Sequence, residues 1–205
     1  MDELAKAAMI AIILLFAMGY LLGSIPFGIV LTRIAGAGDL RTIGSGNIGA
    51  TNVLRTGRKG LAALTLLFDL LKGAAAVWAA QWALPDSPQF AGSIAALGAF
   101  FGHLYPIWLK FRGGKGIATL IGIALALYWP IGLVFVLVWA VMAAIFRISS
   151  LAGITAAASA PVAALALGQE GLIWLFVVTL VFTLLKHRGN IARLMAGEEP
   201  RIGKS

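Results

Sequence analysis

An uncharged run of thirty residues extends from Ile117 to Phe146 and reads IATLIGIALALYWPIGLVFVLVWAVMAAIF. As one helix it would be about 45 Å long, because each residue adds about 1.5 Å. One membrane crossing needs about 20 residues, so the run is long for one helix and short for two. Trp129-Pro130 near its centre suits a turn. Whether the chain turns there distinguishes six from seven transmembrane helices.

Apolar blocks of similar length occupy most of the remaining chain. The first continues to Leu31, and the others span about residues 61–84, 91–109, 151–167 and 172–185. Hydrophobic residues make up 60% of the 205 residues and charged residues only 12%, whereas soluble domains contain about 25% charged residues. This composition excludes a soluble globular protein. We predict an all-α, polytopic integral membrane protein that forms a single transmembrane helical domain over residues 1–205.

The basic residues favour seven helices over six. The chain has 16 Lys and Arg against 8 Asp and Glu, a net charge of +8, and short cytoplasmic loops carry the excess of Lys and Arg in membrane proteins. With a turn at Trp129-Pro130 and the amino terminus outside, 14 of the 16 cations fall on inner segments, at residues 33–59, 110–115, 147 and 186–204. With six helices, Arg147 and the basic tail would face away from the other two basic loops. We therefore predict seven transmembrane helices, an outer amino terminus and a cytoplasmic carboxyl terminus.

Two absences narrow the chemistry. The chain has no Cys, which excludes a thiolate nucleophile or a thiolate metal site. The inner segments contain only three carboxylates, Asp39, Glu198 and Glu199. Because a metal-bound nucleotide needs a cluster of carboxylates, metal-assisted phosphoryl transfer is disfavoured. We expect no metal and no cofactor.

The first informative polar segment is Gly44-Ser45-Gly46-Asn47-Ile48-Gly49-Ala50-Thr51-Asn52, followed by Arg55. Glycines let the backbone turn several N–H groups toward one point, and the hydroxyl and amide side chains add neutral donors. Arg55 can hold a phosphate with its planar guanidinium. The segment is therefore interpreted as an anion cradle; the alternative is a flexible Gly/Ser linker.

The second segment begins at Gly102-His103 and continues through Arg112-Gly113-Gly114-Lys115-Gly116 into the helix that follows. A glycine-rich turn before a helix offers free N–H groups and the positive end of the helix dipole, and Lys115 adds a full charge. It resembles a P-loop only superficially, because Gly follows Lys115 and no strand precedes the turn. His103 is either a hydrogen-bonded anchor or a catalytic group.

The third segment follows the last apolar block and contains His187, Asn190 and Arg193. Cations at the carboxyl end of a helix interact favourably with the helix dipole and with an anionic inner leaflet. Such a structural role accounts for the cations of this segment, but it does not account for Asn190 and His187. Within an apolar block, Asp69 and Lys72 are three residues apart and can form an ion pair on one helix face.

Together the three segments resemble the signature motifs of the bacterial acyl-phosphate:glycerol-3-phosphate acyltransferases. The matching positions are residues 45–52 with Arg55, residues 102–106 with Phe111 and 113–116, and His187, Asn190, 193–194 and 197–198. Residues 23–28 and 69–73 also match the family's pattern. The likeness covers nearly the whole chain in the right order.

The resemblance implies transfer of a fatty acyl group from acyl phosphate to the 1-hydroxyl of sn-glycerol 3-phosphate, giving lysophosphatidic acid and phosphate in the first step of phospholipid synthesis. It also implies a seven-helix enzyme of the bacterial inner membrane with its motifs on the cytoplasmic face. The expected partners are acyl phosphate, glycerol 3-phosphate and membrane lipids. We expect no nucleic-acid ligand, because the basic residues flank membrane helices, and we expect a monomer.

The residues expected to act in catalysis are Ser45, Arg55, His103, Lys115, His187 and Asn190. Those expected to bind substrate are Gly46, Asn47, Gly49, Thr51, Asn52, Gly113, Gly114 and Arg193. The phosphate of acyl phosphate is a good leaving group once its charge is held, so fixed donors can do most of the work. The first segment would hold one phosphate and Lys115 the other, while the two His and Asn190 position glycerol 3-phosphate.

Several alternatives stay open at this point. The base that accepts the hydroxyl proton is either a His or, slightly favoured, a phosphate oxygen of the donor itself. A covalent acyl intermediate on Ser45 is a further option, although no base neighbours it in sequence. A transporter of small phosphorylated anions would also use Arg, Lys and Gly. A non-enzymatic protein that binds anionic lipids would need only the Lys and Arg residues of the inner segments.

Overall fold

The computed structural model describes residues 3–203, and every regular element within this range is helical. The elements are α1 (Glu3–Gly23), α2 (Phe27–Ile34), η1 (Leu40–Thr42), α3 (Ala50–Leu54), α4 (Lys59–Ala83), α5 (Pro88–Leu104), η2 (Ile107–Leu109), α6 (Ile117–Leu127), α7 (Trp129–Phe146), α8 (Ser149–Ala166), α9 (Glu170–Lys186) and α10 (Arg188–Met195). The expected outer amino terminus and the expected single domain over 1–205 extend to residues outside the described range.

Within residues 3–203, five helical segments are long and apolar enough to cross a bilayer. They are Ala5–Ile34, Lys59–Ala83, Pro88–Leu109, Trp129–Phe146 and Ser149–Ala166. A sixth is present if α9 and α10, which are bent by 64° to one another, count as one span. The prediction of an all-helical, multi-pass membrane protein is thus confirmed.

The uncharged run 117–146 forms two helices. Tyr128 separates α6 from α7 with an extended backbone (φ −156°, ψ 100°), and Pro130 lies in the first turn of α7, where its missing N–H costs no helical hydrogen bond. The predicted break in the run is confirmed, but it lies at Tyr128, and the Trp129-Pro130 pair that we expected to form the turn begins α7 instead. However, α6 has only 11 residues, about 16 Å of helix against about 30 Å of hydrocarbon, so it is too short to cross alone. The number of seven crossings stays a prediction.

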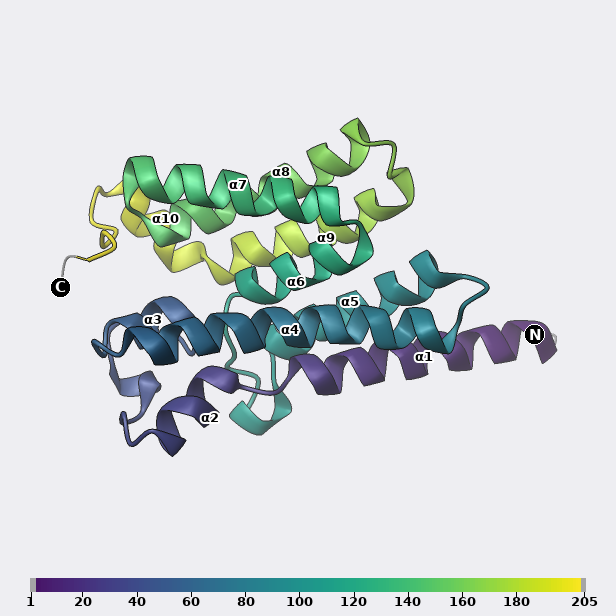
Figure 1. Cartoon of the computed structure of the whole chain (residues 1–205), viewed down its shortest axis with the longest axis horizontal. Helices are drawn as coiled ribbons and strands as arrows, with labels where there is room; N and C mark the ends of the chain where they lie inside the picture. Colours follow the sequence, from purple (N-terminus) through teal and green to yellow (C-terminus); the bar gives the residue numbers. More distant parts are fainter. Residues whose placement is uncertain (1–2, 204–205) are drawn as a thin grey trace.

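Figure 1 shows α7, α8 and α9 on one side of the bundle and α1 and α2 on the other, with α4, α5 and α6 between them. The largest buried side chains of the core include Phe100, Phe135 and Phe176, from α5, α7 and α9. Glycines bring α1 and α5 close together: a Cβ at Gly23 would lie 2.0 Å from the carbonyl oxygen of Ala99. Small residues allow such close helix packing in membranes.

The first span is broken between α1 and α2, and a buried ion pair stabilises the break. Lys72 Nζ lies 2.8 Å from Asp69 Oδ1 and donates to the carbonyl oxygen of Ile25, also at 2.8 Å. Pro26 follows this carbonyl and interrupts the helix. The predicted ion pair is therefore confirmed, and it also provides a partner for a backbone carbonyl that the broken helix leaves free.

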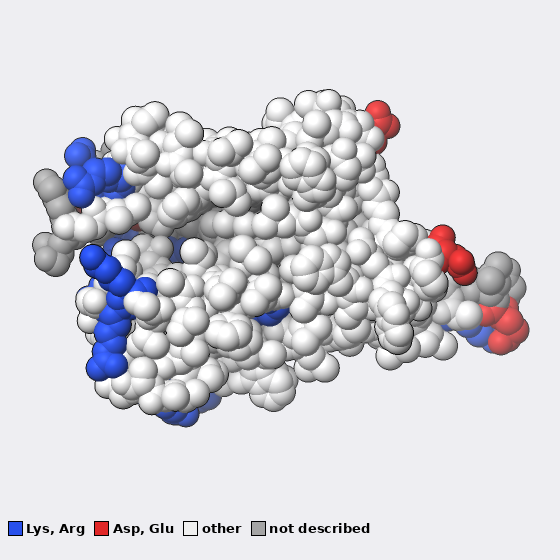
Figure 2. All heavy atoms as spheres, in the orientation of Figure 1, with Lys and Arg blue, Asp and Glu red and all other residues white. Residues whose placement is uncertain are grey.

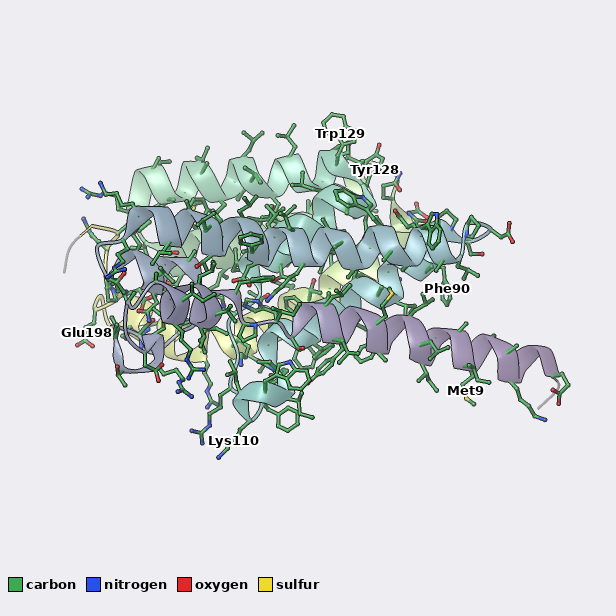
Figure 3. The ribbon with its side chains drawn as sticks, turned by 60° about the horizontal axis from the view of Figure 1, so that its bottom comes forward. Met9, Phe90, Lys110, Tyr128, Trp129 and Glu198 are labelled. Carbon is green, nitrogen blue, oxygen red and sulfur yellow. The ribbon has the colours of Figure 1, made fainter. Side chains whose placement is uncertain are left out.

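Charged side chains gather at the two ends of the molecule. On the face shown in Figure 2, most of the visible Lys and Arg side chains lie at the end of the molecule that α2, α3 and α10 occupy in Figure 1, and the visible Asp and Glu side chains lie mainly toward the opposite end. In Figure 3 Tyr128 and Trp129 lie toward the end away from Glu198. In Figure 1 the connection before α3 and the bend after α9 lie at the basic end, and the connection before α6 lies further inside the bundle.

Candidate active site

Asn52, at the start of α3, organises the first polar segment from inside. Its side chain is 1% exposed. Nδ2 donates to the carbonyl oxygens of Leu40 (3.0 Å) and Ile43 (2.9 Å), and Oδ1 accepts from the backbone N–H of Ser45 at 3.1 Å. Both N–H donors of the amide are thus used within the loop. Asn52 shapes the cradle rather than offering a donor to a phosphate, which differs from the contact that we expected.

Around Asn52, the loop presents Ser45 and Arg55 to solvent. Gly44 and Gly46 have φ values of +53° and +68°, a conformation that costs other residues free energy. A Cβ at Gly44 would also lie 2.6 Å from Asn52 Oδ1. The expected cradle is therefore a tight turn that carries one exposed hydroxyl and one exposed guanidinium.

The remaining residues of this segment lie beside the cradle. Asn47 and Gly49 are half-buried, and the Gly49 carbonyl accepts the Asn52 N–H at 2.9 Å, which starts α3. Thr51 Oγ1 lies 3.1 Å from Ser149 Oγ at the start of α8. This contact joins the first segment to the half of the bundle that carries the third segment.

The glycines of the second segment let the loop before α6 pack on the end of α5. Gly113 N–H donates to Leu104 O (3.2 Å) and Gly114 N–H to His103 O (3.0 Å). A Cβ at Gly114 would lie 2.1 Å from His103 Nε2. These two N–H groups are therefore occupied by protein carbonyls. We expected free N–H donors here. Instead, the glycines let the loop approach the end of α5 closely, and this packing positions Lys115.

His103 is an anchor in the bundle interior. It is 4% exposed, its Nδ1 lies 3.1 Å from Thr119 Oγ1 and 3.7 Å from Asp69 Oδ1. Its partners come from α4 and α6, so the imidazole connects three helices. Of the two roles that the sequence left open, this geometry favours the anchor.

Lys115 joins the second segment to the third. Its ammonium donates to Asn190 Oδ1 at 2.5 Å, although the two residues are 75 positions apart. Burial, helped by the nearby cations Arg193, Arg55 and Lys186 and opposed by Glu199, lowers the pKa of Lys115 to about 8. A lysine with this pKa is mainly an ammonium ion at neutral pH and responds strongly to the charges around it.

Glu199 is the residue that the sequence interpretation missed. Its carboxylate accepts from Asn190 Nδ2 (2.5 Å) and Ser150 Oγ (2.7 Å) through Oε1, and from Arg193 Nε (2.7 Å) through Oε2. Burial alone would raise the pKa of Glu199, but these hydrogen bonds and Arg193 outweigh burial and lower it. Glu199 therefore fixes Asn190, which in turn holds Lys115. The sequence did contain a signal for this residue, because Glu199 is a carboxylate within an otherwise basic segment.

The carboxyl-terminal tail folds back to place this carboxylate. Ile202 N–H donates to Arg147 O at 2.6 Å, and Arg147 Nη2 donates to Ile202 O at 3.2 Å. The side chain of Glu199 is only 7% exposed, whereas Glu198 points away from the bundle in Figure 3. Two adjacent glutamates thus have opposite environments.

His187 lies at the bend between α9 and α10 and is 2% exposed. Its Nδ1 lies 2.8 Å from Thr183 O, one turn earlier in α9. The adjacent Lys186 donates to Leu104 O at 2.8 Å and lies 4.5 Å from the ring centroid of Tyr105. These contacts fix the third segment on the end of α5, beside the second segment.

The three segments therefore form one cluster of cations and neutral donors at the basic end of the bundle. Among the described residues, no three His, Asp or Glu side chains are grouped as a metal site. Such a cluster can hold anionic phosphate groups and stabilise charge that develops on them.

Several known proteins resemble this chain. The family model of glycerol-3-phosphate acyltransferase matches residues 13–197. A glycerol-3-phosphate acyltransferase of Mesorhizobium japonicum is 56% identical over 192 residues, covering 94% of this chain and 96% of the relative. One of Caulobacter vibrioides is 53% identical over 208 residues, covering 100% of this chain and 94% of the relative.

Two solved structures have the same fold. The crystal structure of PlsY (YgiH), an integral membrane glycerol 3-phosphate acyltransferase, in its glycerol 3-phosphate form superposes with a TM-score of 0.87 at 36% identity, covering 94% of this chain and 96% of that one. Its lysophosphatidic acid form has a TM-score of 0.85 at 35% identity, with 94% and 95% covered. The resemblance seen in the three motifs is thus confirmed, and the chain belongs to the glycerol-3-phosphate acyltransferase family.

Proposed function

We propose that this protein transfers a fatty acyl group from acyl phosphate to the 1-hydroxyl of sn-glycerol 3-phosphate, releasing lysophosphatidate and inorganic phosphate. The hydroxyl oxygen attacks the acyl carbon, the bond from that carbon to the phosphate oxygen breaks, and the hydroxyl proton leaves with the phosphate. The observation that carries the proposal is the contact of Lys115 with Asn190, which unites two motifs of the family in one cationic centre.

The chemistry of the centre fits a phosphate leaving group. When a mixed anhydride such as acyl phosphate reacts, negative charge develops on the phosphate that leaves. Stabilising this charge matters more than a strong general acid, and fixed cations in a half-buried site can stabilise it. We propose that Ser45 and Arg55 hold one phosphate and that Lys115 and Arg193 hold the other. Thr51, which contacts Ser149, keeps the two parts adjacent.

Substrate-assisted proton transfer is the route that we propose for the base. His103 and His187 are 4% and 2% exposed, and in each the Nδ1 already faces a partner, Thr119 and the Thr183 carbonyl. Both imidazoles are thereby engaged as structural anchors. A phosphate oxygen of the donor, held beside the attacking hydroxyl, can accept the proton without a protein base.

The membrane arrangement that we propose is a single seven-helix domain in the bacterial inner membrane, with the amino terminus outside and the active site at the cytoplasmic face. The gathering of Lys and Arg at one end supports this orientation. In it, α6 is a half-length helix that begins inside the protein, after the glycine loop. We propose that the enzyme acts as a monomer and without a cofactor.

The decisive experiment uses purified protein in detergent, acyl phosphate and labelled glycerol 3-phosphate, without metal or coenzyme A. Labelled lysophosphatidate is expected, and its absence in a folded preparation would refute the proposed reaction. Two further arms test the alternatives. Uptake of labelled glycerol 3-phosphate into sealed vesicles without donor would indicate a transporter. Trapping of an acyl group on the protein with donor alone would indicate an acyl-Ser45 intermediate.

A further inference from the structure

A second basic site lies beside the α2–α3 connection and the loop around η2. It is a hollow of about 300 Å³ lined by Arg41, Trp108, Leu109, Lys110 and Arg112. In Figure 3 the side chain of Lys110 points away from the bundle, on the side of α1. None of these residues has a part in the proposed reaction.

The backbone that forms the hollow is strained and held in place. Lys110 and Phe111 are consecutive residues with φ values of +52° and +62°, in the left-handed region that side chains disfavour. The conformation persists because Phe111 N–H donates to Pro106 O at 3.0 Å and Trp108 Nε1 donates to Ser24 Oγ on the α1 side at 2.8 Å. The fold thus maintains a costly turn that brings Lys110 and Arg112 beside Trp108.

A neighbouring carboxylate holds the guanidinium of Arg41 in place at the hollow. Asp39 accepts from Arg41 Nε at 2.9 Å and from Nη2 at 2.6 Å. Hydrogen bonds from Arg41 lower the pKa of Asp39 to about 2, so this partner stays ionised. Asp39 accepts no hydrogen bond from Nη1 of Arg41. The three cations Arg41, Lys110 and Arg112 together with the Asp39 carboxylate carry a net charge of +2. A guanidinium fixed in this way binds phosphate with less loss of freedom.

Apolar side chains on the same loop indicate that the anion carries a lipid. Ile107, Trp108 and Phe111 are 51%, 63% and 57% exposed. A free phosphate ion makes no use of three exposed apolar side chains, whereas aromatic residues beside Lys and Arg are typical of a membrane interface. We propose that the hollow binds the phosphate headgroup of an anionic membrane lipid and that these side chains contact its acyl region.

The bound lipid also has a structural consequence. The loop that forms the hollow continues directly into Gly113, Gly114 and Lys115. A headgroup that bridges Arg41 to Lys110 and Arg112 would hold this loop against the α2–α3 connection. Lipid binding should therefore stabilise the protein, and this expectation is independent of the reaction that the enzyme catalyses.

The test compares two variants that each remove two positive charges. In Lys110→Gln/Arg112→Gln the hollow loses its cations; in the matched control Arg188→Gln/Arg201→Gln two exposed cations elsewhere are removed. Each protein, purified in detergent, is given phosphatidylglycerol or phosphatidylcholine with the same acyl chains. Retained lipid is counted by native mass spectrometry, and the unfolding temperature is measured with each lipid.

We expect the native protein and the control to prefer phosphatidylglycerol and to be stabilised by it. The hollow variant should lose about tenfold or more of that preference, because each cation near a headgroup contributes about fivefold. Equal losses in both variants, or no loss in the hollow variant, would overturn the proposal. Displacement of the lipid by millimolar inorganic phosphate would indicate a site for the free ion and would also overturn it. Acyltransferase activity in phosphatidylcholine serves as a separate readout, in which the hollow variant should match the control.

Discussion

Replacing Glu199 by Gln should move the basic limb of the pH profile of activity to lower pH. The carboxylate is joined to the Lys115 ammonium through the two ends of the Asn190 amide, by hydrogen bonds of 2.5 Å each. Adding the width of an amide, the two charges are at most about 7 Å apart. Glu199 opposes the lowering of the Lys115 pKa, so its removal must lower that pKa further.

The size of the shift follows from the distance. Two unit charges about 7 Å apart interact by about 2 kcal/mol at an effective dielectric constant of about 20, and salt reduces this. A shift of about one pKa unit is therefore expected, from about 8 to about 7. At pH 8 the fraction of Lys115 that is protonated falls from about half to about a tenth, and activity should fall about fivefold. At pH 6 Lys115 stays protonated in both proteins.

The assay is kcat/KM for glycerol 3-phosphate between pH 6 and pH 9.5, because this ratio reports pKa values of the free enzyme. Glu198→Gln is the matched control, since it removes the same charge from an exposed neighbour. Activity of the Glu199 variant at pH 6 shows that it is folded. A basic limb that does not move, in a variant active at pH 6, would falsify the role of Lys115 as the titrating cation.

Two further predictions concern stability. Gly114→Ala places a Cβ 2.1 Å from the Nε2 of buried His103; it should lower the free energy of unfolding by about 1–3 kcal/mol and reduce activity. Gly60→Ala, whose Cβ would meet no other part of the protein within 4 Å, is its control in denaturation, and equal stability of the two variants would contradict this packing. Lys72→Met leaves Asp69 buried without its cation and should cost about 3–5 kcal/mol. Restored stability in the double variant with Asp69→Asn is expected, and a Lys72→Met protein as stable as the native one would disprove the pair's role.

Local patterns were sufficient for the helices and for the motifs. Apolar length predicts membrane helices because backbone groups in hydrocarbon must bond internally, and the turn before Pro130 follows from proline's missing N–H. The pairing of Asp69 with Lys72 follows from their spacing on one helix. Each of these features depends on residues that are close together in the chain.

Features that depend on distant segments were not predictable in the same way. Donors that looked free in the sequence, on Asn52 and Gly114, are used by carbonyls of Leu40, Ile43 and His103. Sequence cannot show whether a polar group meets water, substrate or another part of the protein.

The sequence alone therefore indicates the membrane fold, the three motifs and the family. The length of the apolar blocks, the positions of the Lys and Arg residues and the spacing of the motifs can all be read directly from the order of residues. Which glutamate contacts Asn190 is decided only in the folded molecule. Glu198 and Glu199 are chemically identical neighbours, and only the return of the tail onto Arg147 turns Glu199 toward Asn190 and Lys115. Contacts between residues 75 positions apart require the packed helices that bring them together.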